Sequence, residues 1–225
     1  MEKETVIRPS LLAADFKNLG SAVEEMIRLG ITHCHFDVMD GTFVEEISFG
    51  EPLFRSLKPY FSDIIFDVHL MTENPLKQAG LFLRDGAKEL CFHYEAMTLG
   101  DIVKMRELRN DYPEARIGIA FSPETAVEEL KSVLPLFDYV LVMSVVPGKG
   151  GQSYLPGSEE KIRSLASFRN EKRLPYRIGV DGGINKTTGL LSIQAGADFL
   201  VAGSYYFKAT DKKEALSSLH GEVKA

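Results

Sequence analysis

The sequence predicts a single closed (β/α)8 barrel over residues 1–225, and three observations support this fold class. Eight short β-rich runs alternate with helical segments, which is typical of a parallel sheet covered by helices. At several junctions a helical segment, a glycine and a β-rich run follow one another. The eight units fill the chain without a linker or a leftover segment, which suits a closed barrel better than the alternative, an open sheet.

The elements follow in order along the chain. The expected strands cover residues 6–10, 32–38, 64–70, 89–93, 116–121, 139–143, 177–180 and 199–202. The expected helices include amphipathic runs at residues 19–29, 76–84, 102–109, 127–134 and 161–168, and one short helix at residues 52–57. Gly30, Gly86 and Gly196 stand where helices end, so we expect them to adopt the left-handed conformation that terminates a helix.

The composition excludes several classes of protein. A net charge of −6 and a pI near 5.5 argue against nucleic acid or an anionic membrane as a partner. No apolar run approaches the length of a membrane span, and the charged residues 1–5 lack the apolar core of a signal peptide. Cys34 and Cys91 lie in apolar runs where single thiols are commonly buried, so we expect no disulfide framework and a cytoplasmic protein.

Two strands carry polar side chains on one whole face. In HCHFDVM, residues 33–39, the cysteine, phenylalanine and valine share one face, and the histidines, Asp37 and Met39 share the other. FDVHLM, residues 66–71, repeats the pattern with Asp67, His69 and Met71. Because helices cover the apolar face, the polar face points into the barrel. Burial there costs several kcal/mol per group unless the group is paired or binds a metal, so the pattern indicates a site.

The site is expected at the carboxyl ends of the strands, where barrel enzymes work. The residues placed there are Ser10, His35, Asp37, Met39, His69, Met71, His93, Met143, Asp181, Gly203 and Ser204. Among them, His35, Asp37, His69 and Asp181 can converge near the axis. Two imidazoles and two carboxylates suit one divalent cation, Zn2+ before Mn2+, Fe2+ or Co2+. The alternative is a buried hydrogen-bonded His–Asp network without metal.

The two carboxylates also suit a proton-transfer reaction. Inverting a carbon next to a carbonyl needs a base on one face and an acid on the other, and a metal on the carbonyl oxygen stabilises the carbanion. Asp37 and Asp181 come from well-separated strands and can flank a flat enediolate. Met39, Met71 and Met143 lie at strand ends, where they either form a polarizable apolar shelf beside it or simply fill the core.

Glycine-rich loops follow the last three strands. Their candidate residues are Gly148, Lys149, Gly150, Gly151, Gly182, Gly183, Gly203 and Ser204. Barrel enzymes often bind phosphate in these last loops, through backbone N–H groups that no Cβ covers. Ser204, near the start of a helical turn, would add an oriented N–H dipole. Three such loops side by side indicate a phosphate site, although glycines also serve as ordinary turns.

Taken together, the motifs HFDVMDG, DVHLM, FHYEA, MSVVPGKGGQSY, VDGG and VAGS, in this order and spacing, resemble the ribulose-phosphate 3-epimerase family. The opening IRPSLLAADF also fits, and the resemblance extends from about Ile7 to Ser204. It implies a ribulose-phosphate-binding barrel that epimerises a ketose phosphate at C3 with a divalent metal, and it implies homo-oligomers.

The resemblance also implies roles for single residues. Asp37 and Asp181 resemble the acid/base pair, and together with His35 and His69 they resemble the metal ligands. Ser10 and His69 resemble the family's substrate-contacting residues. Met39, Met71 and Met143 resemble its methionine shelf, and the glycine-rich loops resemble its phosphate-binding loops.

Some positions depart from the family pattern. They are Glu45 and Glu46, where Pro-Asn is usual; Val146, where Asn, Glu or Asp is common; Lys149, where an aromatic residue is usual; and Gly179, where an acidic residue is common. None of them removes a proposed ligand, but they change the expected rim of the pocket and the residues behind Asp181. Lys149 either adds a charge near the phosphate or lies in solvent.

The most specific expectation is therefore the conversion of D-ribulose 5-phosphate to D-xylulose 5-phosphate in the pentose phosphate pathway. The changed rim leaves a hexulose phosphate such as allulose 6-phosphate as an alternative substrate. A decarboxylase or aldolase of the same fold would resemble D-x-K-x-x-D, but this chain has Asp37-Val38-Met39-Asp40. A non-catalytic phosphosugar-binding barrel is the third alternative, and the intact His-His-Asp-Asp set argues against it.

Overall fold

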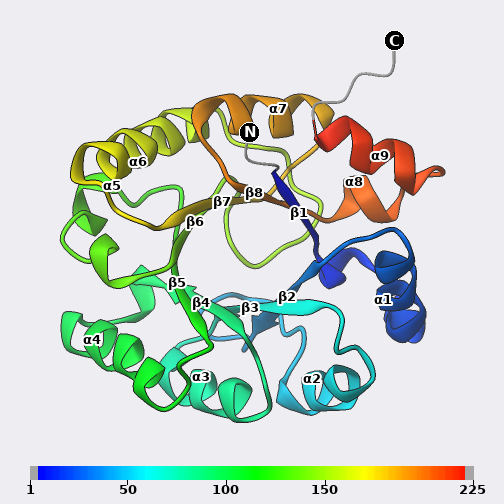
Figure 1. Cartoon of the computed structure of the whole chain (residues 1–225), viewed down its shortest axis with the longest axis horizontal. Helices are drawn as coiled ribbons and strands as arrows, with labels where there is room; N and C mark the ends of the chain where they lie inside the picture. The colour runs from blue at the N-terminus through cyan, green and yellow to red at the C-terminus, as the bar shows by residue number, and fades with distance from the viewer. Residues whose placement is uncertain (1–4, 221–225) are drawn as a thin grey trace.

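The computed structural model describes residues 5–220, and its eight parallel strands form a barrel ringed by helices (Figure 1). The strands are β1 (Val6–Pro9), β2 (His33–Met39), β3 (Ile65–Met71), β4 (Glu89–His93), β5 (Arg116–Phe121), β6 (Tyr139–Met143), β7 (Arg177–Asp181) and β8 (Phe199–Ala202). They pair in the order β1-β8-β7-β6-β5-β4-β3-β2. A parallel bridge between Ser10 and His35 joins the end of β1 to β2 and closes the sheet. The predicted (β/α)8 barrel is confirmed.

Helices connect successive strands on the outside of the barrel. They are α1 (Leu19–Arg28), α2 (Glu51–Leu57), α3 (Pro75–Arg84), α4 (Leu99–Glu107), α5 (Val127–Leu130), α6 (Ser158–Lys172), α7 (Lys186–Ala195), α8 (Ser204–Phe207) and α9 (Lys212–Leu219). Among the described residues, no helix is long and apolar enough to span a membrane. Parts of the predicted 1–225 domain, residues 1–4 and 221–225, lie outside the described residues, and with them most of the charged N-terminal segment.

Several predicted boundaries were wrong, and each has a physical reason. The helix predicted at residues 127–134 ends at Leu130, because Pro135 has no amide hydrogen and its ring would clash with the carbonyl four residues earlier. Helix α4 begins earlier than predicted, because the Thr98 side chain caps its first turn by accepting from the Asp101 N–H. Helix α6 is longer than predicted at both ends. The predicted left-handed helix ends are confirmed, with φ of 77°, 94° and 114° at Gly30, Gly86 and Gly196.

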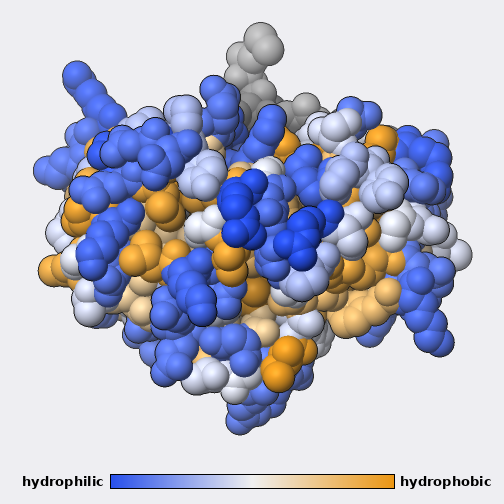
Figure 2. Space-filling view, turned by 90° about the horizontal axis from the view of Figure 1, so that it is seen from below, coloured by the Kyte–Doolittle hydropathy of each residue, from blue (hydrophilic) through white to orange (hydrophobic). Residues whose placement is uncertain are grey.

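The apolar face of each strand packs under the helices. Phe36 of β2 and Phe66 of β3 meet Phe54 of α2 at ring-centroid distances of 5.8 and 5.6 Å, in edge-to-face geometry. Figure 2 shows a side of the molecule where hydrophilic side chains cover most of the surface and hydrophobic ones lie scattered between them. The free thiols of Cys34 and Cys91 are buried, as predicted.

The polar face of the strands points inward, and a layer of buried charge fills the barrel near the amino ends of the strands. Arg8 of β1 forms ion pairs with Asp67 of β3 at 2.8 Å and with Glu89 of β4 at 2.6 Å. The Arg8 guanidinium lies 3.7 Å from the centre of the Phe199 ring. Gly179 leaves the space for this ring, because a Cβ there would lie 2.0 Å from a Phe199 ring carbon. This layer supports the site above it.

Candidate functional site

Four polar side chains converge at the carboxyl end of the barrel. His35 and Asp37 come from β2, His69 from β3 and Asp181 from β7, and one ligand-type atom of each lies within 4.8 Å of the others. Three of the four are buried and Asp181 is partly exposed. Side chains at alternate positions of a strand share a face, so the register of β2 against β3 brings His69 opposite Asp37.

The donor atoms of this cluster fit a metal ion. His35 Nε2 and His69 Nδ1 each lie 3.2 Å from Asp37 Oδ1 and 3.3 Å from one another. Asp181 Oδ2 lies 3.5 Å from His35 Nε2 and 3.6 Å from His69 Nδ1. Ligands about 2.1 Å from a tetrahedral Zn2+ are roughly 3.4 Å apart, and nitrogen and carboxylate oxygen are its usual donors. The cluster could therefore hold a divalent cation.

The other nitrogen of His35 has a partner of its own. His35 Nδ1 lies 3.0 Å from Asp67 Oδ2, and Asp67 also accepts from the Tyr139 hydroxyl at 2.8 Å. Burial raises the pKa of Asp67, but the charge of Arg8 and the hydrogen bonds outweigh burial and hold that pKa well below its ordinary value. An ionised Asp67 accepts the Nδ1 hydrogen, so when His35 is neutral its Nε2 lone pair faces the cluster.

Asp37 is held from two sides. Its Oδ1 faces the two imidazoles, and its Oδ2 accepts a hydrogen bond of 2.6 Å from the Ser10 hydroxyl. Burial raises the pKa of Asp37, but the charge and hydrogen bond of His35 outweigh burial and hold it well below its ordinary value. Burial likewise lowers the pKa of His35, and the charge of Asp37 outweighs it and raises that pKa well above its ordinary value. These shifts favour a protonated His35 beside an ionised Asp37 when no cation is bound.

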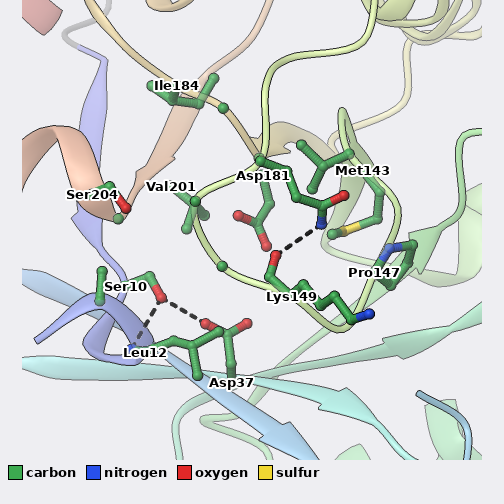
Figure 3. A pocket seen from close by; sticks show the side chains of 18 of the residues that line it. Ser10, Leu12, Asp37, Met143, Pro147, Lys149, Asp181, Ile184, Val201 and Ser204 are labelled. Atoms are coloured by element: carbon green, nitrogen blue, oxygen red, sulfur yellow. Dashed lines mark hydrogen bonds between the residues drawn. The ribbon is translucent and has the colours of Figure 1, made fainter. Parts of the chain in front are cut away.

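A cavity of about 350 Å³ opens above the cluster, and Figure 3 shows its labelled side chains. Asp37 and Asp181 reach it from opposite parts of the sheet, with their carboxylates turned toward the same space. The other predicted site residues that line it are Ser10, Met39, Met71, Met143, Gly148, Lys149, Gly150, Gly151, Gly182, Gly183, Gly203 and Ser204. His35 and His69 are fully buried and do not line the cavity. His69 has protein partners at both ring nitrogens, so it faces the cluster rather than the open space.

The glycine-rich loops after β6, β7 and β8 meet at one side of this cavity. Gly183 has a φ of +62°, and a Cβ there would lie 2.2 Å from the backbone nitrogen of Tyr154. Gly148 has a φ of +104°, and its Cβ would lie 2.6 Å from Val44. Glycine is therefore required at both positions by conformation and by close approach.

Two of the positions that depart from the family pattern contact one another. The Lys149 ammonium pairs with the Glu45 carboxylate at 3.0 Å, across the rim between the loops after β2 and β6. Both side chains are largely exposed, so the Lys149 charge points to the rim rather than to the floor of the cavity. Val146 is 52% exposed beside them.

Sequence reasoning gave no role to three residues around the cluster. Asp67 lies on the polar face of β3, and this position in the alternating pattern could have identified it as a site residue. His93 ends β4 beside His69, and Glu95 follows it within the FHYEA motif. Burial lowers the pKa of His93 below its ordinary value, which favours its neutral form.

A (β/α)8 barrel with a buried imidazole–carboxylate cluster beneath an open cavity defines the class of barrel enzymes that work at the carboxyl ends of their strands. The model of the ribulose-phosphate 3 epimerase family matches residues 6–207. The chain belongs to this family, and it is an isomerase of the epimerase class.

Two bacterial relatives agree with this assignment. The chain is 39% identical to the ribulose-phosphate 3-epimerase of Treponema pallidum over 210 residues, which cover 93% of this chain and 94% of the relative. It is 36% identical to that of Bacillus subtilis over 217 residues, covering 96% and 98%. The 3-keto-L-gulonate-6-phosphate decarboxylase structure from Vibrio cholerae superposes with a TM-score of 0.73 over 97% of this chain and 96% of its own, at 13% identity. At that identity the likeness shows the fold alone.

Proposed function

We propose that this protein interconverts D-ribulose 5-phosphate and D-xylulose 5-phosphate by inverting C3. The observation that carries the proposal is the pair Asp37 and Asp181, which face one cavity from opposite parts of the barrel (Figure 3). A base on one side of C3 and an acid on the other is the minimum that an epimerisation through an enediolate requires. The names of the relatives support the pentulose phosphate as substrate.

We further propose that His35, Asp37, His69 and Asp181 hold one divalent cation, most readily Zn2+. When bound, such an ion acts as a Lewis acid that stabilises negative charge on a substrate oxygen. In each direction one of the two carboxylates removes the C3 proton and the other delivers a proton to the far face. Ser10 orients the Asp37 carboxylate through its hydrogen bond to Oδ2.

Met39, Met71 and Met143 are proposed as the apolar shelf under the flat intermediate. Thioethers are polarizable and bring no competing proton, so they keep water away from the carbanion without quenching it. The glycine-rich loops are proposed to bind the phosphate through backbone N–H groups, with Ser204 beside them.

The test is to measure the kcat/KM of the purified protein for three substrates. We expect kcat/KM to be highest for D-ribulose 5-phosphate, lower for D-allulose 6-phosphate and lowest for free D-ribulose. A preference for the hexulose phosphate would overturn the substrate and keep the reaction class. Equal turnover of free ribulose and its phosphate would overturn the phosphate site.

A further inference from the structure

A third histidine, His93, lies behind the cluster. His69 turns its Nδ1 toward Asp37 and its Nε2 toward His93, whose own Nε2 lies 3.0 Å away. The two rings are inclined by 22° with centroids 5.1 Å apart, which suits an edge-to-edge hydrogen bond between near-coplanar imidazoles. Both histidines are fully buried. A hydrogen bond between them needs one donor and one acceptor, so the tautomers of the two rings are linked.

Glu95 sets the direction of this hydrogen bond. Its Oε2 lies 3.1 Å from His93 Nδ1, and its Oε1 accepts from the Ser122 N–H at 2.8 Å and from the Thr125 hydroxyl. Interactions with His93, Thr125 and Ser122 outweigh burial and lower the pKa of Glu95 to about 2. At neutral pH the carboxylate is therefore only an acceptor.

The Glu95 acceptor fixes the hydrogen positions of both imidazoles, first on His93 and then on His69. His93 Nδ1 must carry the hydrogen, so His93 Nε2 has a free lone pair. That lone pair accepts from His69 Nε2–H, and the lone pair of His69 Nδ1 is left pointing at Asp37 and the other ligands. Metal-binding histidines usually donate their second N–H to such a partner, which fixes the tautomer and the ring orientation.

We propose that Glu95 and His93 are positioning residues that fix His69 as a metal ligand. The proposal rests on the metal centre proposed above. It gives a role to the FHYEA motif and links the ligand cluster to the loop after β5, where Ser122 and Thr125 hold the Glu95 carboxylate.

Glu95→Gln is the sharpest test, because it keeps the size of the side chain and changes its hydrogen bonding. If the amide oxygen keeps the bonds from Ser122 and Thr125, the amide nitrogen faces His93 Nδ1. His93 must then accept at Nδ1 and carry its hydrogen on Nε2, where it meets the hydrogen of His69. With His69 in its metal-binding tautomer, two N–H donors would face one another. The alternative tautomer places the hydrogen on Nδ1, where it competes with the metal, so either arrangement weakens metal binding.

Zn2+ affinity of the full chain, measured by competition with a chromophoric chelator, is the readout. We expect the Kd to rise about 10- to 100-fold in Glu95→Gln, the usual effect of losing such a partner. Glu124→Gln removes the same charge from an exposed position in the loop after β5 and serves as the control with parental affinity. The visible spectrum of the Co2+-substituted protein should also change in Glu95→Gln and not in Glu124→Gln.

His93 supplies a second, independent pair of variants. His93→Leu removes the acceptor and leaves His69 Nε2–H buried without a partner, while His93→Gln can restore an acceptor oxygen. We expect weaker Zn2+ binding in His93→Leu and partial recovery in His93→Gln, with folding of each checked by circular dichroism. Parental Kd values and Co2+ spectra in Glu95→Gln and in a folded His93→Leu would overturn the inference and leave the proposed function standing. A parent protein that binds no metal would overturn the metal centre, and this inference with it.

Discussion

At the scale of single residues, hydrogen bonds decide what each member of the cluster can do. Ser10 is the clearest case, because its hydroxyl holds the one oxygen of Asp37 that does not face the histidines. A base whose carboxylate can rotate loses its alignment with C3, even when it still contacts the metal. We therefore expect Ser10 to matter for the proposed proton transfer more than for metal binding.

We predict that Ser10→Ala lowers kcat by about 10- to 100-fold and leaves the metal content unchanged. A hydrogen bond to a charged group contributes roughly 1.5–3 kcal/mol, and about 1.4 kcal/mol corresponds to tenfold in rate. Steady-state kinetics and metal analysis of the variant check this. Ser48→Ala, which removes a hydroxyl bound to the backbone carbonyl of Asp37, should cost less. A parental kcat in Ser10→Ala would remove Ser10 from the site.

The raised pKa of His35 predicts how metal binding depends on pH. The metal needs the unprotonated Nε2, so the proton competes with the metal below the pKa of His35, and the raised pKa moves that competition to higher pH. The apparent Kd for Zn2+ should rise as the pH falls from about 8 to about 6, by about tenfold per pH unit for each proton displaced. Calorimetric titration at several pH values measures this. A Kd that stays constant until the pH is below the ordinary histidine range would contradict it.

At the scale of elements, the loops after β6 and β7 contain glycines, Gly148 and Gly183, whose positive φ and close contacts leave no room for a side chain. Gly183 combines a left-handed φ with an approach of 2.2 Å to the backbone of Tyr154, so the β7 loop and the β6 loop fix one another. Pro147 to Gly151 was recognisable from the sequence as a glycine-rich loop, but this contact with Tyr154 was not. It depends on how two loops far apart in the sequence pack together.

We predict that Gly183→Ala raises the KM for the sugar phosphate at least tenfold while the metal is retained. The added Cβ must displace the backbone of the β6 loop, which lines the side of the cavity where we propose that the phosphate binds. Gly157→Ala is the matched control, because Gly157 has a φ of +90° but no atom within 4 Å of the added Cβ. Both variants should lose about 1–2 kcal/mol of stability from the left-handed backbone. An equal rise in KM in both would mean that strain, rather than the loop contact, causes the effect.

At the scale of the whole molecule, the barrel makes one site from strands that are far apart in sequence. Alternation along β2 and β3 was enough to predict that His35, Asp37 and His69 point inward, and eight strand–helix units without a leftover segment were enough to predict the barrel. The hydrogen bonds from Ser10 to Asp37 and from His69 to His93 depend on side-chain rotamers and strand stagger, which the sequence pattern does not encode. The Glu45–Lys149 ion pair joins residues from two loops, and the sequence identified both only as unusual.

The proposed metal ligands come from β2, β3 and β7, so a bound cation should stabilise the whole fold. Binding to the native state alone adds about 2.7 kcal/mol when the free metal is at 100 times its Kd. We predict that removal of the metal by a chelator lowers the Tm by several degrees and that Zn2+ restores it. Calorimetry of the parent and of His35→Ala measures this. His35→Ala should show a smaller difference between the two conditions, and the same difference in both proteins would contradict the ligand assignment.

The central claim is that Asp37 and Asp181 act on opposite faces of C3. The most direct measurement is the reaction in D2O, followed by NMR at C3 of substrate and product, with the parent and with Asp181→Asn. The parent should place deuterium at C3 of the product. Asp181→Asn should lose epimerisation by roughly 100-fold or more, the range for a general acid–base group, while it still exchanges the C3 proton of one epimer. Product without deuterium in the parent, or near-parental epimerisation by Asp181→Asn, would contradict the two-carboxylate account.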